Sequence, residues 1–258
     1  MLVYERHYSD KDLLFDNILS SYFEILSGIE NSGNATPLKS SKLPTPLVVA
    51  LNSAAPIYRR TYWPEDDASN TRWIAAAMPF LDRFRDPFAK RLASIFQTPW
   101  RSVPYRDDVV RYSNWAESYT EDERDCVYCA IGSASPGNSG RASLETIFHE
   151  ASHSLVFPDY GTVADSINNT AKAARRQSPD QFWHAVILYT AGRLTQNLFE
   201  AAGEPGYEMF ADRASLWRLG DWFGYRSALE KHWEPFIVGK ATSMRFALAN
   251  CVTEILRG

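Results

Sequence analysis

The sequence predicts a mainly helical α+β protein with a small sheet in the middle of the chain. Two long parts of the chain carry apolar residues at the three- and four-residue spacing of amphipathic helices. Between them, residues 107–113 and 125–132 are short, alternating and rich in β-branched residues, which is typical of strands. The chain has 258 residues, 45% of them hydrophobic, so it is long enough to bury a sizeable core.

The helices are expected at residues 10–28, 47–60, 68–84, 87–97, 141–156, 163–176, 179–200, 208–219, 222–232 and 240–256. Gly28 is a plausible end for the first helix, and Asp86 and Pro87 fit the cap and first position of the fourth. Residues 31–46 are rich in Ser, Asn and Pro and are expected to form a loop. No long flexible linker follows, so we expect one domain over residues 1–258, with a helical N-terminal part (1–100) and a second part (101–258).

Composition and charge argue against several classes of protein. The net charge is −4, whereas a nucleic-acid-binding protein usually carries a basic patch. The sequence contains no apolar run of membrane-spanning length, and its first residues do not resemble a signal peptide. The cytoplasm is therefore the default location, although secretion stays open. The three cysteines form no disulfide framework, and Cys126 and Cys129 are interpreted as small buried residues.

One motif carries chemistry. Residues 149–153 read His-Glu-Ala-Ser-His, a HExxH pattern, within a segment whose apolar residues have helical spacing. On a helix His149 and His153 lie one above the other, so both imidazoles can reach one metal ion. Glu150 lies about a quarter-turn around the helix, too far to be a first ligand but close to a metal-bound water.

Each residue type has a chemical reason to be in this motif. Neutral imidazoles are good ligands for Zn²⁺, and three protein ligands leave a fourth position for water. The ion lowers the pKa of that water towards about 7, and a neighbouring carboxylate can take its proton. The sequence therefore predicts one bound zinc ion, held by His149 and His153, with Glu150 as general base.

With this motif the chain resembles the zincin metallopeptidases, over roughly residues 105–215. In that family the HExxH helix lies below the edge strand of a small sheet, and residues 125–132 could be that strand. Residues 55–74 and 182–192 are also similar to a set of bacterial HExxH proteins, a similarity that supplies no substrate. The resemblance implies a zincin-like fold, with residues 101–258 as the metal-binding catalytic part.

Four residues compete to be the third ligand. Asp159 stands six residues after His153, as in metzincins, but Val156 replaces the Gly that their turn requires. Asp165 lies in a segment similar to the GTxD of aspzincins, with one residue too many. Glu208 begins a segment that resembles the ExxAD element of membrane-embedded gluzincins, although this chain has no membrane span.

His184 is the preferred third ligand. It lies in the expected helix 179–200, opened by Ser178 and Pro179, which is apolar almost all round and is therefore expected to be buried. A buried histidine needs a partner, and a metal ion is one option beside a backbone carbonyl. A site of three histidines would depart from the gluzincins, which use Glu at this place.

Tyr189 lies in the same expected helix and is a candidate donor of a hydrogen bond to the developing oxyanion, the role a Tyr or His has in several zincins. The resulting prediction is a zinc-dependent hydrolase, most simply a metallopeptidase that attacks an amide bond of a peptide or protein with a zinc-bound water. The alternatives are a zincin-like module that binds zinc without catalysis, and a metal-free helical interaction protein. Oligomeric state and cleavage specificity cannot be predicted from the sequence.

Overall fold

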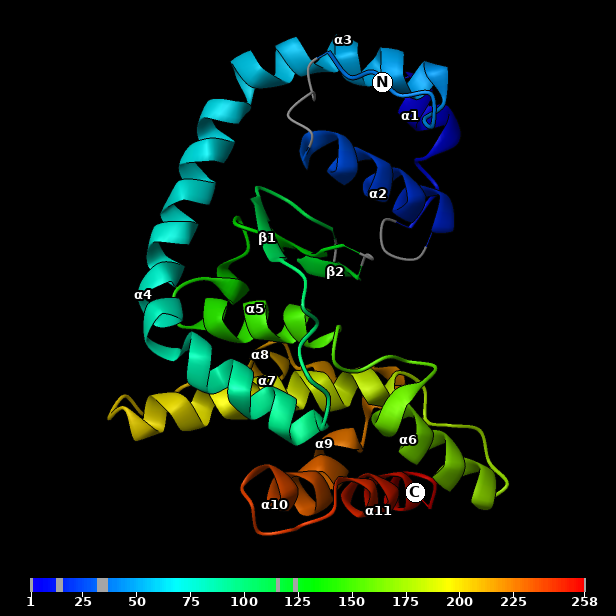
Figure 1. The fold of residues 1–258 in the computed structure, drawn as a ribbon, viewed down its shortest axis with the longest axis vertical. Coiled ribbons are helices and arrows are strands. Elements are labelled where there is room, and N and C mark those ends of the chain that lie inside the picture. Colours follow the sequence, from blue (N-terminus) through cyan, green and yellow to red (C-terminus); the bar gives the residue numbers. More distant parts are fainter. Residues whose placement is uncertain (1, 13–15, 32–36, 115–116, 123–124, 258) are drawn as a thin grey trace.

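The computed structural model describes residues 2–12, 16–31, 37–114, 117–122 and 125–257. Helices dominate these residues and surround a small mixed sheet, which confirms the predicted α+β, mainly helical class. Figure 1 shows the N-terminal helices at one end of the molecule, the sheet in the middle and the later helices at the other end. None of the described helices is long and apolar enough to cross a membrane.

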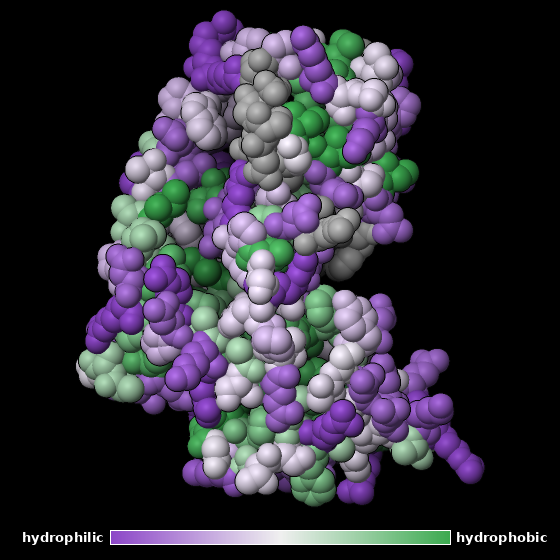
Figure 2. Space-filling view, viewed as in Figure 1, coloured by the Kyte–Doolittle hydropathy of each residue, from purple (hydrophilic) through white to green (hydrophobic). Residues whose placement is uncertain are grey.

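The described N-terminal helices are α1 (Leu2–His7), α2 (Asn17–Asn31), α3 (Thr45–Thr61) and α4 (Trp63–Phe96). The expected helix 10–28 begins later, at Asn17, where the Asp16 carboxylate accepts hydrogen bonds from the amides of Ile18 and Leu19. Residues 13–15 of that expectation lie outside the described residues. Helix α3 buries no side chain. Figure 2 shows apolar side chains gathered at this end of the molecule.

Helix α4 corrects the expected break at Asp86 and Pro87, because it runs through Pro79 and Pro87 without ending. A proline inside a helix removes one hydrogen bond and usually kinks the chain. Here the apolar side chains on one face of α4 are buried on both sides of Pro87, and their packing outweighs the local break. Figure 1 shows α4 as a long, bent helix that reaches from the N-terminal helices to the later ones.

The sheet consists of β1 (Tyr105–Val110), β2 (Ser118–Asp122) and β3 (Val127–Gly132). Its order is β1-β3-β2, with β3 parallel to β1 and antiparallel to β2. The expectation that residues 125–132 form an edge strand is therefore wrong, because β3 pairs on both sides. The antiparallel strand β2 has no strand beside its outer edge in the described residues.

The remaining helices are α5 (Ala142–Ser152), α6 (Gly161–Ala173), α7 (Phe182–Ala201), α8 (Phe210–Arg213), α9 (Tyr225–Ala228), α10 (Glu234–Ile237) and α11 (Met244–Ile255). The short turns are η1 (Pro136–Asn138), η2 (Leu216–Arg218), η3 (Gly220–Trp222) and the π-helical η4 (Leu229–Trp233). Helix α7 starts three residues later than expected, since Gln181 has the left-handed backbone that an α-helix excludes. Ser178 does not cap this helix, and its hydroxyl instead donates to the Asn168 side chain.

The sheet lies between α2 and α5. Tyr119 of β2 points to one side, where its ring packs edge-on against Phe23 of α2. Ser118 and Thr120, which flank it in the strand, point to the other side and hydrogen-bond α5. Helix α5 therefore forms the floor below the sheet, as Figure 1 shows.

The main core lies on the opposite side of α5, among α4, α7 and the C-terminal helices. Phe88 of α4 stacks on Phe148 of α5 with ring centroids 4.2 Å apart. A second, smaller cluster joins Trp73 and Ala77 of α4 to Ile131 of β3 and Ile147 of α5. Helix α5 is thus fixed from the α4 side, from the sheet and from α7.

A buried carboxylate also anchors α5. Glu145 accepts hydrogen bonds from the Tyr207 hydroxyl, at 2.5 Å, and from the amide of Phe210. Burial raises the pKa of Glu145 to about 7, while these hydrogen bonds lower it. Gly192 of α7 makes room for this arrangement, because an added Cβ would lie 2.8 Å from Glu145 Oε1 and 3.0 Å from Met209.

Replacing Gly192 by alanine should therefore destabilise the fold by about 1–3 kcal/mol, since the new methyl group collides with the buried carboxylate and the Met209 side chain. The measurement is urea unfolding of the wild type and Gly192→Ala. Gly28→Ala is the matched control, because a Cβ at that helical glycine meets nothing within 4 Å. Helix propensity should leave that control neutral or up to about 1 kcal/mol more stable. Equal stability of the two variants would contradict the packing described for Glu145.

Candidate metal centre

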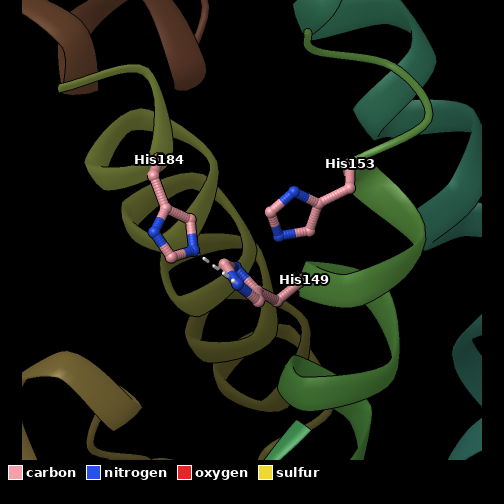
Figure 3. A group of neighbouring side chains, drawn as sticks. All are labelled: His149, His153 and His184. Atoms are coloured by element: carbon pink, nitrogen blue, oxygen red, sulfur yellow. Dashed lines mark hydrogen bonds between the residues drawn. The ribbon is translucent and has the colours of Figure 1, made fainter. Parts of the chain in front are cut away.

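Three histidines from two helices converge on one point. His149 lies in the last turn of α5, His153 follows its last residue with helical backbone angles, and His184 lies in the first turn of α7. A ring nitrogen from each of the three lies within 4.8 Å of those of the other two. His184 Nε2 and His149 Nε2 are 3.1 Å apart, and Figure 3 shows the three rings turned toward one another.

Burial keeps these imidazoles neutral. His149 is only 8% exposed, whereas His153 and His184 are half-buried. Burial lowers the pKa of His184 to about 4 and, with the charge of His184 adding to it, that of His153 to about 3. The pKa of His149 is also well below its ordinary value for the same reason. Each ring therefore carries a nitrogen lone pair at neutral pH, which is the form that binds metals.

The ring nitrogens of the three histidines form few hydrogen bonds with one another. The contact between His149 and His184 is the one hydrogen bond within the group, and the buried Nδ1 of His149 has no partner among the described residues. Three nitrogens around a tetrahedral zinc lie roughly 3.3 Å apart, given Zn–N distances of about 2.0–2.1 Å. The His149–His184 distance of 3.1 Å is close to this value, and the nitrogens of all three rings lie within 4.8 Å of one another, so the group could hold a metal ion.

The second residue of the motif, Glu150, contacts the sheet. The Glu150 carboxylate is directed at β2, where the Ser118 hydroxyl lies 2.5 Å from Oε1 and the Thr120 hydroxyl 2.7 Å from Oε2. Burial raises the pKa of Glu150 to about 7, the two hydroxyl hydrogen bonds lower it, and the charge of Asp107 raises it further. The carboxylate can therefore hold or release a proton near neutral pH.

Strand β2, whose hydroxyls contact the Glu150 carboxylate, was missed by the sequence analysis. Its sequence, Ser-Tyr-Thr-Glu-Asp, is short and ends in two acidic residues that strands disfavour, and no strand was predicted there. The segment forms a strand because it pairs with β3, where Thr120 lies opposite Cys129. The Ser-x-Thr spacing, which puts both hydroxyls on one face of a strand, was the available signal.

Cys126 and Cys129 are both buried, which confirms their interpretation as small buried residues. Burial raises the pKa of the Cys129 thiol well above its ordinary value, so the thiol stays protonated at neutral pH.

Tryptophans border the three histidines. The Trp183 ring centroid lies 5.6 Å from that of His153 and 5.4 Å from that of His184. Trp222 of η3 stands edge-on to His184 with the centroids 5.6 Å apart. These indoles exclude water from part of the surroundings of the rings, which contributes to the burial described above.

Tyr189 is engaged in a different group. Its side chain is fully buried, and its hydroxyl donates to Glu234 Oε2 at 2.5 Å. Glu234 also forms an ion pair with Arg193, one turn further along α7. Burial and the Glu234 charge raise the pKa of Tyr189. The structure therefore gives this hydroxyl a partner in the core, and no described contact joins it to the three histidines.

The other candidates for the third ligand do not join His149 and His153. Asp159, Asp165 and Glu208 are exposed, and among the described residues the group of converging ligand atoms consists of the three histidines. Asp212, the last residue of the ExxAD segment, accepts a hydrogen bond from Trp217 and pairs with Arg226. Of the four candidates, the structure brings His184 to the motif.

Comparison with models of known protein families, with curated proteins and with solved structures finds no match. The chemistry of the site is therefore argued from its own residues.

The purified protein should contain about one zinc ion per chain after dialysis against zinc. His149→Ala, His153→Ala and His184→Ala should each weaken zinc binding by more than about 100-fold, because each removes a ligand. Elemental analysis and competition with a chromogenic chelator measure this. His232→Ala is the control, since His232 bonds to Glu254 outside the group. Zinc retained at wild-type affinity by His184→Ala, or absent from the wild type, would contradict the site.

Proposed function

We propose that this protein is a zinc-dependent hydrolase that cleaves amide bonds in peptides. One observation carries the proposal: the HExxH histidines of α5 meet a third histidine from α7, although 35 positions separate His149 from His184. A chance HExxH on a helix has no reason to be joined by a third neutral ligand from a different helix. The proposal agrees with the resemblance of the motif to that of the zincin metallopeptidases.

His149, His153 and His184 would hold the ion, and their neutral state favours binding because no proton has to be displaced first. Zinc held by three protein ligands supplies Lewis acidity, which lowers the pKa of a coordinated water to about 7 and polarises a carbonyl. His153 and His184 are half-buried, so each keeps some contact with solvent.

Glu150 is the residue that moves the proton. In amide hydrolysis its carboxylate would accept a proton from the attacking water and then donate it to the nitrogen of the leaving amine. A group that performs both steps works best with a pKa near the working pH, and burial places that of Glu150 at about 7. Ser118 and Thr120 position the carboxylate and stabilise its ionised form.

The sheet supports a peptide as the substrate. Strand β2 holds Glu150 on one face, and its outer edge pairs with no strand in the described residues. An extended peptide can add to such an edge through its backbone, and it would then lie beside the strand that positions the general base. Small esters lack the repeated amides that such pairing uses.

Replacing Glu150 by glutamine should leave zinc content unchanged and lower peptide hydrolysis by about 10²–10⁴-fold, because the amide cannot accept the proton. The measurement is cleavage of a quenched fluorescent peptide mixture by zinc-loaded protein, with a chelator-treated sample as the blank. Glu200→Gln, an exposed substitution on α7, serves as the matched control and should keep full activity.

Two results would decide against this function. Hydrolysis at the wild-type rate by Glu150→Gln would remove the proposed mechanism. Zinc bound by the wild type without cleavage of any peptide would favour a zinc-binding module without catalysis.

A further inference from the structure

A pocket next to the candidate metal centre has no role in the mechanism above. It lies between α6 and the start of α7, closed on one side by Pro158 and Asp159 and on another by residues 178–181 and Trp183. Its volume is about 260 Å³. This is below the roughly 300–1,000 Å³ of sites for drug-sized ligands, so the pocket suits a single long side chain.

Trp183 connects the pocket to the three histidines. It lines the pocket, and its ring also packs against the rings of His153 and His184. A side chain in the pocket is therefore one indole ring away from the place where a peptide bond would be cut. This distance suits a residue of the substrate at or next to the scissile bond.

The lining carries negative charge. Asp159 and Asp180 are exposed carboxylates, no Lys or Arg lines the pocket, and neither aspartate forms an ion pair among the described residues. The nearby Arg175 and Arg176 are exposed on the loop before α7 and do not line it. The N-terminus of α7 adds only about half a positive elementary charge, so the two carboxylates dominate.

The rest of the lining is apolar or neutral, with Ala164, Ile167 and the Trp183 indole beside the amide of Asn168. A lysine or arginine side chain combines an apolar stem with a cationic end. Its stem can pack on the apolar wall, and its charge can face the carboxylates and the face of the indole. An acidic side chain would be repelled, and a short apolar one would gain nothing from the carboxylates.

We propose that this pocket binds a lysine or arginine side chain of the peptide substrate and selects peptides with a basic residue beside the bond that is cut. The inference rests on the proposed function for its meaning as a specificity site. Its physical content, preferential binding of a cationic side chain, does not depend on hydrolysis and can be measured separately.

The test uses fluorescein-labelled pentapeptides, Ala-Ala-Lys-Ala-Ala and the same peptide with norleucine in place of lysine. Their Kd values are measured by fluorescence anisotropy with the full-length Glu150→Gln protein, both zinc-loaded and metal-free. The lysine peptide should bind about tenfold more tightly, as one exposed ion pair and one cation–π contact allow. The Asp159→Asn/Asp180→Asn double substitution should remove this preference and leave the norleucine Kd within about twofold.

Asp82→Asn, which removes an exposed carboxylate of α4 away from the pocket, is the matched control and should keep the preference. Circular dichroism verifies that each variant is folded. Equal Kd values for the two peptides, or a preference that survives the double substitution, would overturn the proposal. A lysine preference in a protein that cleaves no peptide would support the pocket and overturn only the hydrolytic function. Cleavage without a lysine preference would support the hydrolytic function and overturn the proposal for the pocket.

Discussion

The contact between α5 and α7 determines whether a site exists. Within α5, the helical repeat alone places His149 and His153 one above the other. His184 reaches them only because α7 lies along α5 in one register, which the Glu145 contacts with Tyr207 and Phe210 and the space at Gly192 help to fix. A slip of α7 by one residue would move it about 1.5 Å along its axis and about 100° around it, and would turn His184 away.

Two adjacent residues of α5 meet two different environments. His149 faces α7 and Glu150 faces β2, as neighbours on a helix point about 100° apart. Burial acts on both, but in opposite directions, because it always favours the uncharged form. It lowers the pKa of the imidazoles, which frees their lone pairs, and it raises that of the carboxylate towards neutrality. One physical effect thus gives neutral imidazoles and a carboxylate with a raised pKa, the states that the proposed metal ligands and the proposed general base would need.

The sequence was informative wherever the signal is local. The HExxH pattern and the apolar spacing around it predicted α5, and the apolar character of the expected helix 179–200 pointed to a buried helix that carries His184. What it missed depends on distant partners. Strand β2 is stabilised by pairing with β3, and Pro87 is tolerated because α4 packs against the core. Gln181, just before α7, has a left-handed backbone that its side chain does not predict. The sequence favoured His184 over Asp159, Asp165 and Glu208, and the packing of α7 is what brings its ring to the motif.

His149 and His184 enclose the end of α5, all of α6 and the loop before α7 between them. An ion bound by both residues would close this segment into a covalent-like loop, as a disulfide does. The loop would lower the conformational entropy of the unfolded chain more than that of the folded chain. The ion would then stabilise the fold as well as take part in catalysis. Binding of the ion should protect the segment between His149 and His184 from proteolysis. The first turn of α7, which carries His184, should become more mobile when the ion is removed.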